Sequence, residues 1–287
     1  MKRTVELERL VSTFISELKL GSTQYLGGES MRELQPNKDR FFYPALAIAI
    51  SGTAFAGFWF TYFGPIIGQT YPPTGGALHV HGWSFFLLYL LFPLQAILIA
   101  RRRRALHMML GRLSVMLVVL MTLTGILVLS VRVGDAMREG EPRVWLMYGP
   151  LILSNLVLFV SFYGAGLYMA VTNRMQAHKR LIVVACAIGI GAGFFRLILF
   201  LSGFHPLSLP AGTLSCSLFI LIGIIYDWLT RRSVHPVYWI GLVALFAVEI
   251  PLLPQVSEGN VAWVNQWLAA LGEQIGFLYQ PEPEVEF

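Results

Sequence analysis

Long apolar stretches separated by short polar turns make up most of the chain, and seven of them approach the length of a membrane-spanning helix. A helix needs roughly 20 apolar residues to cross the hydrocarbon layer of a bilayer. The stretches cover approximately residues 41–63, 79–100, 107–131, 146–171, 181–202, 212–229 and 236–253. This pattern predicts an all-α fold, an integral membrane bundle of seven transmembrane helices.

Two further segments, one near each end of the chain, repeat apolar residues at the i, i+3, i+4 spacing of an amphipathic helix. The first, residues 5–20, would lie on the inner membrane surface or pair with another chain. The second carries Trp263 and Trp267, which suit the outer interface. We therefore expect three parts: a cytoplasmic amphipathic arm (1–40), the seven-helix transmembrane domain (41–253), and an outer interfacial helix with an acidic tail (254–287).

The composition supports a membrane protein and excludes two other classes. Hydrophobic residues make up 56% of the 287 residues and charged residues only 13%, whereas a soluble domain carries about 25% charge. Disordered chains are rich in charge and poor in apolar residues, so disorder is excluded as well. The expected partners are membrane lipids, with no nucleic acid. Cys186 and Cys216 fall near opposite ends of their spans, which makes a disulfide between them improbable.

The placement of Lys and Arg predicts the orientation of the bundle. With the N-terminus inside, seventeen of the 21 basic residues fall on inner segments, three fall on outer segments, and Arg196 lies within a span. Short cytoplasmic loops carry an excess of Lys and Arg. The chain is therefore expected to cross the membrane with its N-terminus inside and its C-terminus outside.

His107 and His178 open the third and fifth predicted spans, at matched depth on the inner side. Two imidazoles so placed could bind one metal from opposite sides, as the axial ligands of haem b do. Nearby basic residues such as Arg112 would suit haem propionates or lipid phosphates. Alternatively, the two histidines simply cap their helices among the headgroups. No Cys-x-x-Cys-His motif occurs, so any haem would be non-covalent.

His79 and His81 open the second predicted span in the sequence Gly-Gly-Ala-Leu-His-Val-His-Gly-Trp. Histidines two positions apart share a face in an extended segment but not on a helix. Either they form a metal-binding turn, which His205 in an outer loop could join, or only one of them points inward. His81 is thus a candidate cofactor or metal ligand, and a hydrogen-bonded structural histidine is the other interpretation.

Three other ionisable residues fall within or close to the predicted spans. Arg196 lies about 22 Å from the inner end of its span, at 1.5 Å per residue, and a lone arginine there needs a partner. Glu249 is at a similar depth, so a buried Arg196–Glu249 charge pair is expected, with a haem propionate or anionic substrate as the alternative. Asp227 could orient His178 as a supporting carboxylate or pair with Arg231, four residues on.

Several motifs in residues 75–200 resemble a bacterial family of small polytopic membrane proteins. They are His81-Gly82 at the start of a span, Gln95 near its inner end, Leu-His-x-x-Leu-Gly-Arg (106–112), His-Lys-Arg-Leu (178–181) and Arg196 in the span that follows. The resemblance implies a compact helical bundle in a bacterial cytoplasmic (inner) membrane, and it brings no activity with it. More distantly, histidines on consecutive spans resemble cytochrome b561-like electron carriers, whose ligands lie well inside the helices.

Three functions are compatible with these features. The first is electron transfer by a b-type haem bound at the inner pair of histidines, with His81 as a ligand on the outer side. The second is handling of a transition metal, or transport of a small molecule, at an outer site of His79, His81 and His205 above the Arg196–Glu249 pair. The third is an accessory or assembly subunit whose amphipathic end helices dock onto other membrane subunits or a redox partner.

Overall fold

The computed structural model describes residues 36–72, 74–140, 144–205, 207–257 and 261–279, and its regular elements there are all helices. The chain divides into two compact units, Met1–Tyr43 and Pro44–Phe287. Helix α2 (Pro36–Phe58) begins in the first unit and continues into the second. The amphipathic helix predicted over residues 5–20 and the acidic end of the tail lie outside the described residues.

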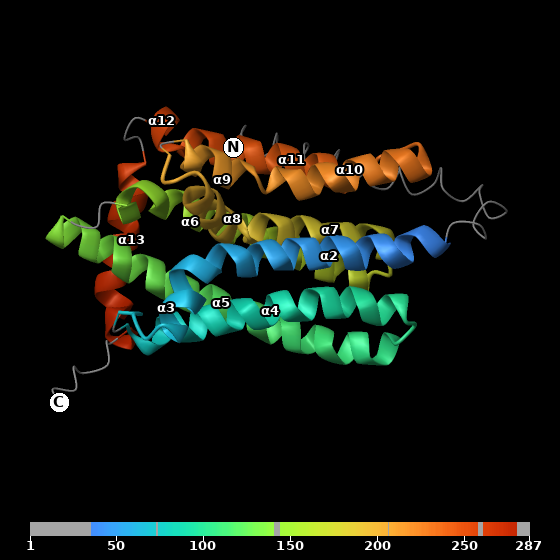
Figure 1. Ribbon diagram of the computed structural model, residues 1–287, viewed down its shortest axis with the longest axis horizontal. Helices are drawn as coiled ribbons and strands as arrows, with labels where there is room; N and C mark the ends of the chain where they lie inside the picture. The colour runs from blue at the N-terminus through green and yellow to red at the C-terminus, as the bar shows by residue number, and fades with distance from the viewer. Residues whose placement is uncertain (1–35, 73, 141–143, 206, 258–260, 280–287) are drawn as a thin grey trace, which may run out of the picture. The chain divides into compact units, whose positions relative to one another are not determined.

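Every predicted apolar stretch coincides with helical structure, so the all-α prediction is confirmed (Figure 1). The longer helices after α2 are α4 (Gly76–Ala100), α5 (Arg104–Glu139), α6 (Val144–Val171), α7 (Met175–Gly189), α8 (Gly191–Leu201), α10 (Ser217–Arg231), α11 (Pro236–Glu249) and α13 (Ala262–Ile275). The shorter elements are a π-helix, η3 (Trp59–Phe63), with α3 (Gly64–Ile67), α9 (Ser208–Leu214), η4 (Ile250–Leu252), α12 (Pro254–Ser257) and η5 (Gly276–Leu278).

Several of these helices are long and apolar enough to cross a membrane. Five helices of the described chain meet that criterion, and a sixth crossing results if the bent pair α7–α8 forms one span. The helix over Pro236–Leu252 is apolar but shorter, at 17 residues, against the roughly 20 that a straight crossing needs. The protein is therefore a multi-pass membrane protein with five or six candidate spans, and the seventh crossing stays a prediction.

The fifth predicted span is broken rather than straight, because α7 and α8 meet at Ile190 with a bend of 45°. Glycines on both sides of the break allow side chains of other helices to approach the backbone. A Cβ at Gly189 would lie 2.7 Å from the hydroxyl oxygen of Tyr89, and one at Gly191 would lie 2.7 Å from the amide nitrogen of Asn155. Glycine also disfavours a continuous helix by about 1 kcal/mol relative to alanine.

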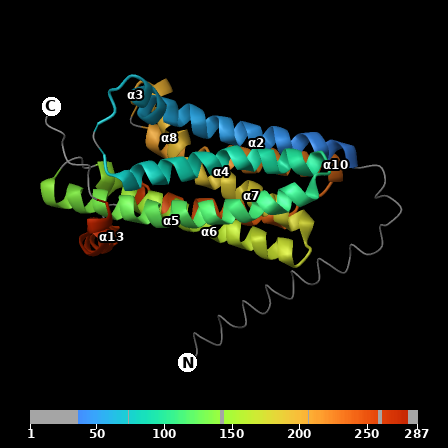
Figure 2. The ribbon, with the colours of Figure 1, turned by 90° about the horizontal axis from the view of Figure 1, so that it is seen from below.

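Helix α5 continues eight residues beyond the predicted end of its span and supports the C-terminal helix α13. Val133 of α5 and Leu268 of α13 are fully buried in one apolar cluster, and Gly140, with φ 74°, ends α5. Figures 1 and 2 show α13 lying crosswise to the long helices, against α5. Trp263 and Trp267 are 68% and 51% exposed. The predicted C-terminal amphipathic helix is thus confirmed as an element.

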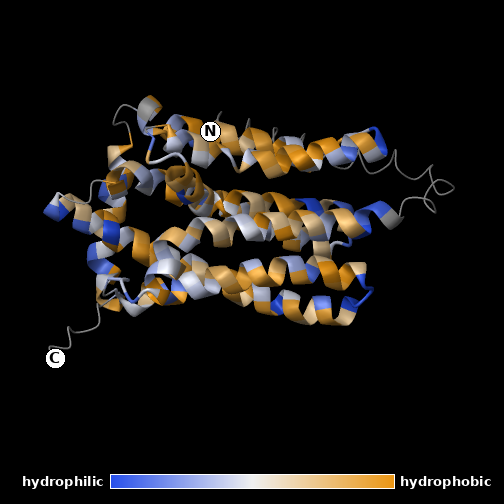
Figure 3. Ribbon diagram, in the orientation of Figure 1, coloured by the Kyte–Doolittle hydropathy of each residue, from blue (hydrophilic) through white to orange (hydrophobic). Residues whose placement is uncertain are grey.

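The turns α4–α5, α6–α7 and α10–α11 lie at the same end of the second unit (Figure 1), where Figure 3 shows hydrophilic residues, and they contain Arg101 to Arg104, Arg174 and Arg232. Each turn contains a non-glycine residue in the left-handed region: Arg102 at φ 59°, Asn173 at φ 58° and Arg232 at φ 56°. Cations close to helix C-termini interact favourably with the helix dipole. We call this end, defined by residues 101–104, 172–174 and 232–235, the basic end.

Gly272 allows α13 to cross α5 closely, and this contact gives a prediction for stability. A Cβ at Gly272 would lie 2.5 Å from the carbonyl oxygen of Ser130, whereas one at Gly276 would meet the Val131 side chain at an ordinary 3.6 Å. We expect Gly272→Ala to destabilise the docking of α13 by about 1–3 kcal/mol, with Gly276→Ala close to the wild type. Thermal unfolding in detergent measures both, and equal midpoints would contradict the close crossing.

Candidate functional site

The structure brings His107 and His178 together near the basic end. Their ring centroids are 6.4 Å apart, with the ring planes inclined at 81°. His107 lies in the first turn of α5 and His178 in the first turn of α7. Two residues 71 positions apart in the sequence are therefore neighbours, which the matched depth of their helices predicts.

Hydrogen bonding orients the ring of His178. Its Nδ1 lies 2.8 Å from the carbonyl oxygen of Gly166 on α6. Because a carbonyl only accepts, Nδ1 carries the hydrogen, and Nε2 of the neutral ring keeps its lone pair. A backbone carbonyl bound in this way is the usual support of a metal-binding histidine. Nδ1 of His107 is buried, and no described residue hydrogen-bonds to it.

Three further polar side chains of α4, α5 and α6 belong to the same region. The hydroxyl oxygens of Ser114 and Tyr163 are 2.7 Å apart. The Ser114 hydroxyl also donates a hydrogen bond to the carbonyl of Gly111 at 2.7 Å. Both amide atoms of Gln95 are buried and find no partner among the described residues. A Cβ at Gly111 would lie 3.8 Å from the Gln95 amide nitrogen, so Gln95 lies beside this turn of α5.

These side chains form a set that we call the histidine cluster: Gln95, His107, Ser114, Tyr163 and His178. Buried polar atoms without a partner cost about 1–3 kcal/mol each, and in native proteins such atoms commonly mark an ion, a water or a functional role. The cluster has three of them, on His107 and Gln95. It therefore offers donors and acceptors to a ligand. Arg112, predicted to contact haem propionates, is exposed on α5.

The outer histidines point to different partners. His79 places Nδ1 3.0 Å from the hydroxyl of Tyr62, and His81 places Nδ1 2.9 Å from the carbonyl oxygen of Met121. Both lie within α4, so the extended metal-binding turn does not form. His205 is exposed, and its Nδ1 accepts the N–H of Leu207.

The predicted outer metal site of His79, His81 and His205 is thus not assembled. The part of the chain that the structure describes contains no group of three or more His, Cys, Asp or Glu side chains able to hold a metal ion. The physical reason is the helical periodicity of α4, which turns residues two positions apart to different faces. His81 is the hydrogen-bonded histidine that the alternative interpretation expected.

Arg196 and Glu249 do not form the predicted ion pair and have other partners. Arg196 donates to the carbonyl of Ala192 at 2.9 Å, and its guanidinium carbon lies 4.7 Å from the centre of the Phe58 ring. Glu249 accepts a hydrogen bond from the amide of Asn155 at 3.0 Å. Arg196 therefore faces an aromatic ring and Glu249 faces an uncharged amide, whereas their similar depth in the membrane predicted that they would face each other.

Asp227 is the centre of a buried ion cluster that joins α7, α10 and α11. Arg180 donates to its two carboxylate oxygens at 2.8 and 2.7 Å, and Arg231 donates at 2.7 Å. The backbone N–H of His235 also donates, at 3.2 Å. Asp227 is fully buried and Arg180 is 1% exposed. The predicted contact with Arg231 is present, whereas the carboxylate faces Arg180 rather than His178.

The role of Arg180 is absent from the sequence-based prediction. The sequence predicts Arg180 only as an inner basic residue that would suit haem propionates or lipid phosphates, because its partner Asp227 is 47 positions away. The available signal is its spacing from Gln176, one helical turn earlier, whose carbonyl and side-chain oxygens accept from Arg180 at 2.8 and 3.0 Å. The burial of Arg180 itself comes from Asp227 on α10, which the spacing within α7 does not show.

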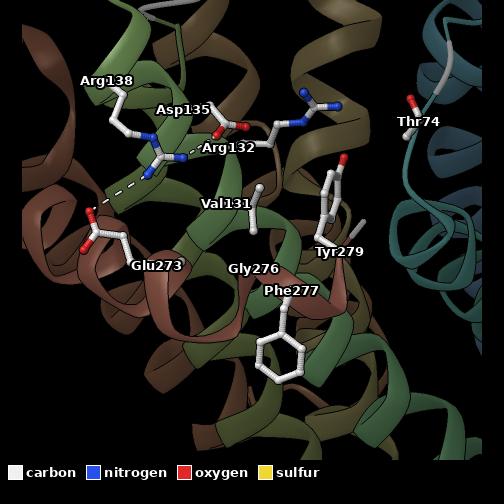
Figure 4. A pocket seen from close by; sticks show the side chains of 10 residues that line it. Thr74, Val131, Arg132, Asp135, Arg138, Glu273, Gly276, Phe277 and Tyr279 are labelled. Atoms are coloured by element: carbon white, nitrogen blue, oxygen red, sulfur yellow. Dashed lines mark hydrogen bonds and ion pairs between the residues drawn. The ribbon is translucent and has the colours of Figure 1, made fainter. Parts of the chain in front are cut away.

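A surface hollow of about 490 Å³ lies between the end of α5 and α13. In Figure 4, Arg138 points toward Glu273, while Arg132 lies beside Tyr279. Arg138 is 2.7 Å from Asp135 and 4.0 Å from Glu273, and the guanidinium of Arg132 is 5.6 Å from the Tyr279 ring centre. The hollow is lined by balanced charges that connect α13 to α5, and it contains none of the predicted ligands.

The Asp227 cluster gives a prediction for stability. Asp227→Asn leaves Arg180 and Arg231 buried or half-buried without their counter-charge, which costs about 3–5 kcal/mol for a buried pair. Asp135→Asn removes the partially exposed pair with Arg138, worth about 1 kcal/mol or less. We expect a large fall in the thermal unfolding midpoint for the first variant only. Similar midpoints for the two variants would show that the cluster does not hold the helices together.

His235 gives a prediction for the dependence of stability on pH. Its Nδ1 accepts the N–H of Val237 and caps α11, and burial, with the charge of Arg180, lowers its pKa from 6.5 to about 4. Because the folded-state pKa is below the unfolded one, this stabilisation is complete above pH 6.5 and is lost as the pH falls through about 4.

The matched variant is His235→Asn, which retains a capping acceptor without titrating. Unfolding midpoints measured between neutral and acidic pH should fall more steeply for the wild type than for this variant. Parallel curves would rule out a depressed pKa at His235.

Comparison with known proteins assigns this geometry to no family. No family model matches the chain, no curated protein matches it, and no solved structure matches it. The resemblance of the motifs in residues 75–200 to a bacterial membrane protein family therefore stays a prediction. The function has to be argued from the residues of this chain.

Proposed function

We propose that this multi-pass membrane protein binds a b-type haem non-covalently through His107 and His178 and transfers electrons. The observation that carries the proposal is the separation of 6.4 Å between the two ring centroids. These side chains come from two helices that begin at the same, basic end of the second unit. The proposal needs no covalent attachment motif.

The donor set fits a haem iron. Both side chains are imidazoles, the residue type that commonly holds haem iron, and their ring centroids lie 6.4 Å apart. His107 and His178 together would therefore hold the iron. When bound, a haem held by His107 and His178 would supply one-electron transfer.

The residues around the pair would support this role. The Gly166 carbonyl fixes the orientation and tautomer of His178. The buried amide of Gln95 has a donor and an acceptor that no described residue hydrogen-bonds. Exposed arginines, Arg104 at the basic end and Arg112 two turns further along α5, would provide charge for carboxylates or lipid phosphates.

The same proposal includes the finer topology. We propose seven crossings of a bacterial cytoplasmic membrane, with the N-terminus and the basic end inside. The accumulation of Arg residues in three turns at one end supports this orientation. The histidine cluster would then lie close to the cytoplasmic face, where a soluble redox partner or another membrane subunit could exchange electrons with it.

The test is the optical spectrum of the protein, expressed with haem supply and purified, in its oxidised and reduced forms. The wild type should show a Soret band that shifts on reduction. His107→Ala and His178→Ala should each lower the amount of haem bound per protein by at least about tenfold. Substitution of residues that merely support a metal ligand already costs this much in affinity. His205→Ala, at an exposed histidine, is the matched control and should retain the band.

A second variant separates loss of a ligand from loss of the fold. His178→Met supplies a different axial ligand, so haem should be retained with a raised reduction potential. A wild type without a Soret band would overturn the proposal, as would full haem content in both alanine variants. Metal analysis of the same samples would reveal a transition metal at the pair in place of haem.

A further inference from the structure

The break between α7 and α8 is surrounded by polar side chains from other parts of the bundle. The hydroxyl of Tyr89 donates to the carbonyl of Cys186 at 2.8 Å, and the thiol of Cys216 lies 3.7 Å from the carbonyl oxygen of Ile188. Asn155 lies directly against Gly191. Two backbone carbonyls beside the break are thus satisfied by side chains from α4 and the α9–α10 junction, as buried backbone in a membrane requires.

Glu249 reaches this region from the end of α11 and is fully buried. Its Oε1 accepts the hydrogen bond from Asn155. Its Oε2 is buried and has no hydrogen-bond partner among the described residues. An ionised carboxylate with one bare oxygen is strongly disfavoured in an apolar interior, whereas a protonated carboxyl group avoids burying a charge. The surroundings therefore match the protonated acid.

Few other charges face Glu249. Helices α6, α9 and α12 and the short helix η4 contain no Asp, Glu, Lys, Arg or His residue in their described lengths. Cys216 is the titratable group that interacts with Glu249 from the α9–α10 junction. Arg196 on α8 is engaged by the Ala192 carbonyl and the Phe58 ring. The charged groups of α7 and α10, including Asp227, lie toward the other end of α11, which is roughly 20 Å long at 1.5 Å per residue.

We propose that Glu249 is a proton-binding site coupled to the break in the α7–α8 pair. Loss of the proton from the carboxyl oxygen to water leaves a carboxylate that needs donors at Oε2, and the polar groups around the break are those within reach. Ionisation therefore rearranges the contacts of Asn155, Cys216 and the break. A discontinuous helix beside an ionisable group is the arrangement that membrane transporters use for coupling ions. This site is separate from the proposed haem site.

The first test is chemical labelling of the full-length protein with dicyclohexylcarbodiimide, a hydrophobic reagent that reacts with protonated carboxyl groups. Peptide mass spectrometry should find the label on Glu249 at acidic pH, decreasing at least tenfold as the pH rises. Exposed Glu273, 67% accessible, is the internal control and should remain unlabelled. Absence of label at every pH, or labelling independent of pH, would overturn the proposal. Protection by Na⁺ at fixed pH would instead indicate a metal-cation site.

The second test measures the coupling through Cys216. Both cysteines are free and buried, so Cys186→Ser leaves Cys216 as the only thiol. In this background, the rate of maleimide labelling should rise severalfold less with pH when Glu249 is present than in Glu249→Gln, because a carboxylate beside Cys216 opposes formation of the reactive thiolate. Glu249→Asp should restore the difference, and Glu273→Gln should leave it unchanged. Identical pH profiles with Glu249 and with Gln at this position would show that protonation does not affect the break.

Discussion

The carboxylate of Asp227 holds three helices in fixed register. It accepts hydrogen bonds from Arg180 of α7, Arg231 of α10 and the backbone N–H that precedes α11. In an apolar bundle, lipid tails compete with helix–helix packing, so apolar contacts alone discriminate weakly between alternative rotations of a helix. A buried, bidentate ion pair specifies one rotation, because any other leaves a charge without its partner.

The position of His178 depends on this constraint. Arg180 follows His178 by two residues on α7, so fixing Arg180 against Asp227 also fixes the rotation and depth at which the imidazole meets α6 and α5. The Gly166 carbonyl then sets the direction of the ring. The approach of His178 to His107 thus follows from an ion cluster that contains neither histidine. At the far end of the same span, the break at Ile190 allows Asn155 to contact both the backbone and Glu249.

The pattern of apolar stretches, and the depth of each polar residue within its predicted span, predicted much of this arrangement. The apolar stretches gave the helices, since length and hydropathy are read along one dimension. The equal depth of His107 and His178 in the membrane also predicted that they are close, because each lies in the first turn of a helix that starts at the same end. The same reasoning paired Arg196 with Glu249, although in the structure these residues contact Phe58 and Asn155. Equal depth is necessary for contact, but the rotation of each helix about its axis decides which side chain is met.

The sequence by itself determined that this is a helical, multi-pass membrane protein with its basic residues concentrated at one end, because hydrophobic length and charge placement follow from local composition. Only the tertiary structure decided that α7 and α8 form a bent pair, that Arg180 is buried against Asp227, and that Glu249 lies by an uncharged amide. Each of these depends on residues far apart in the chain meeting at one point. No periodicity within a single helix encodes such a meeting.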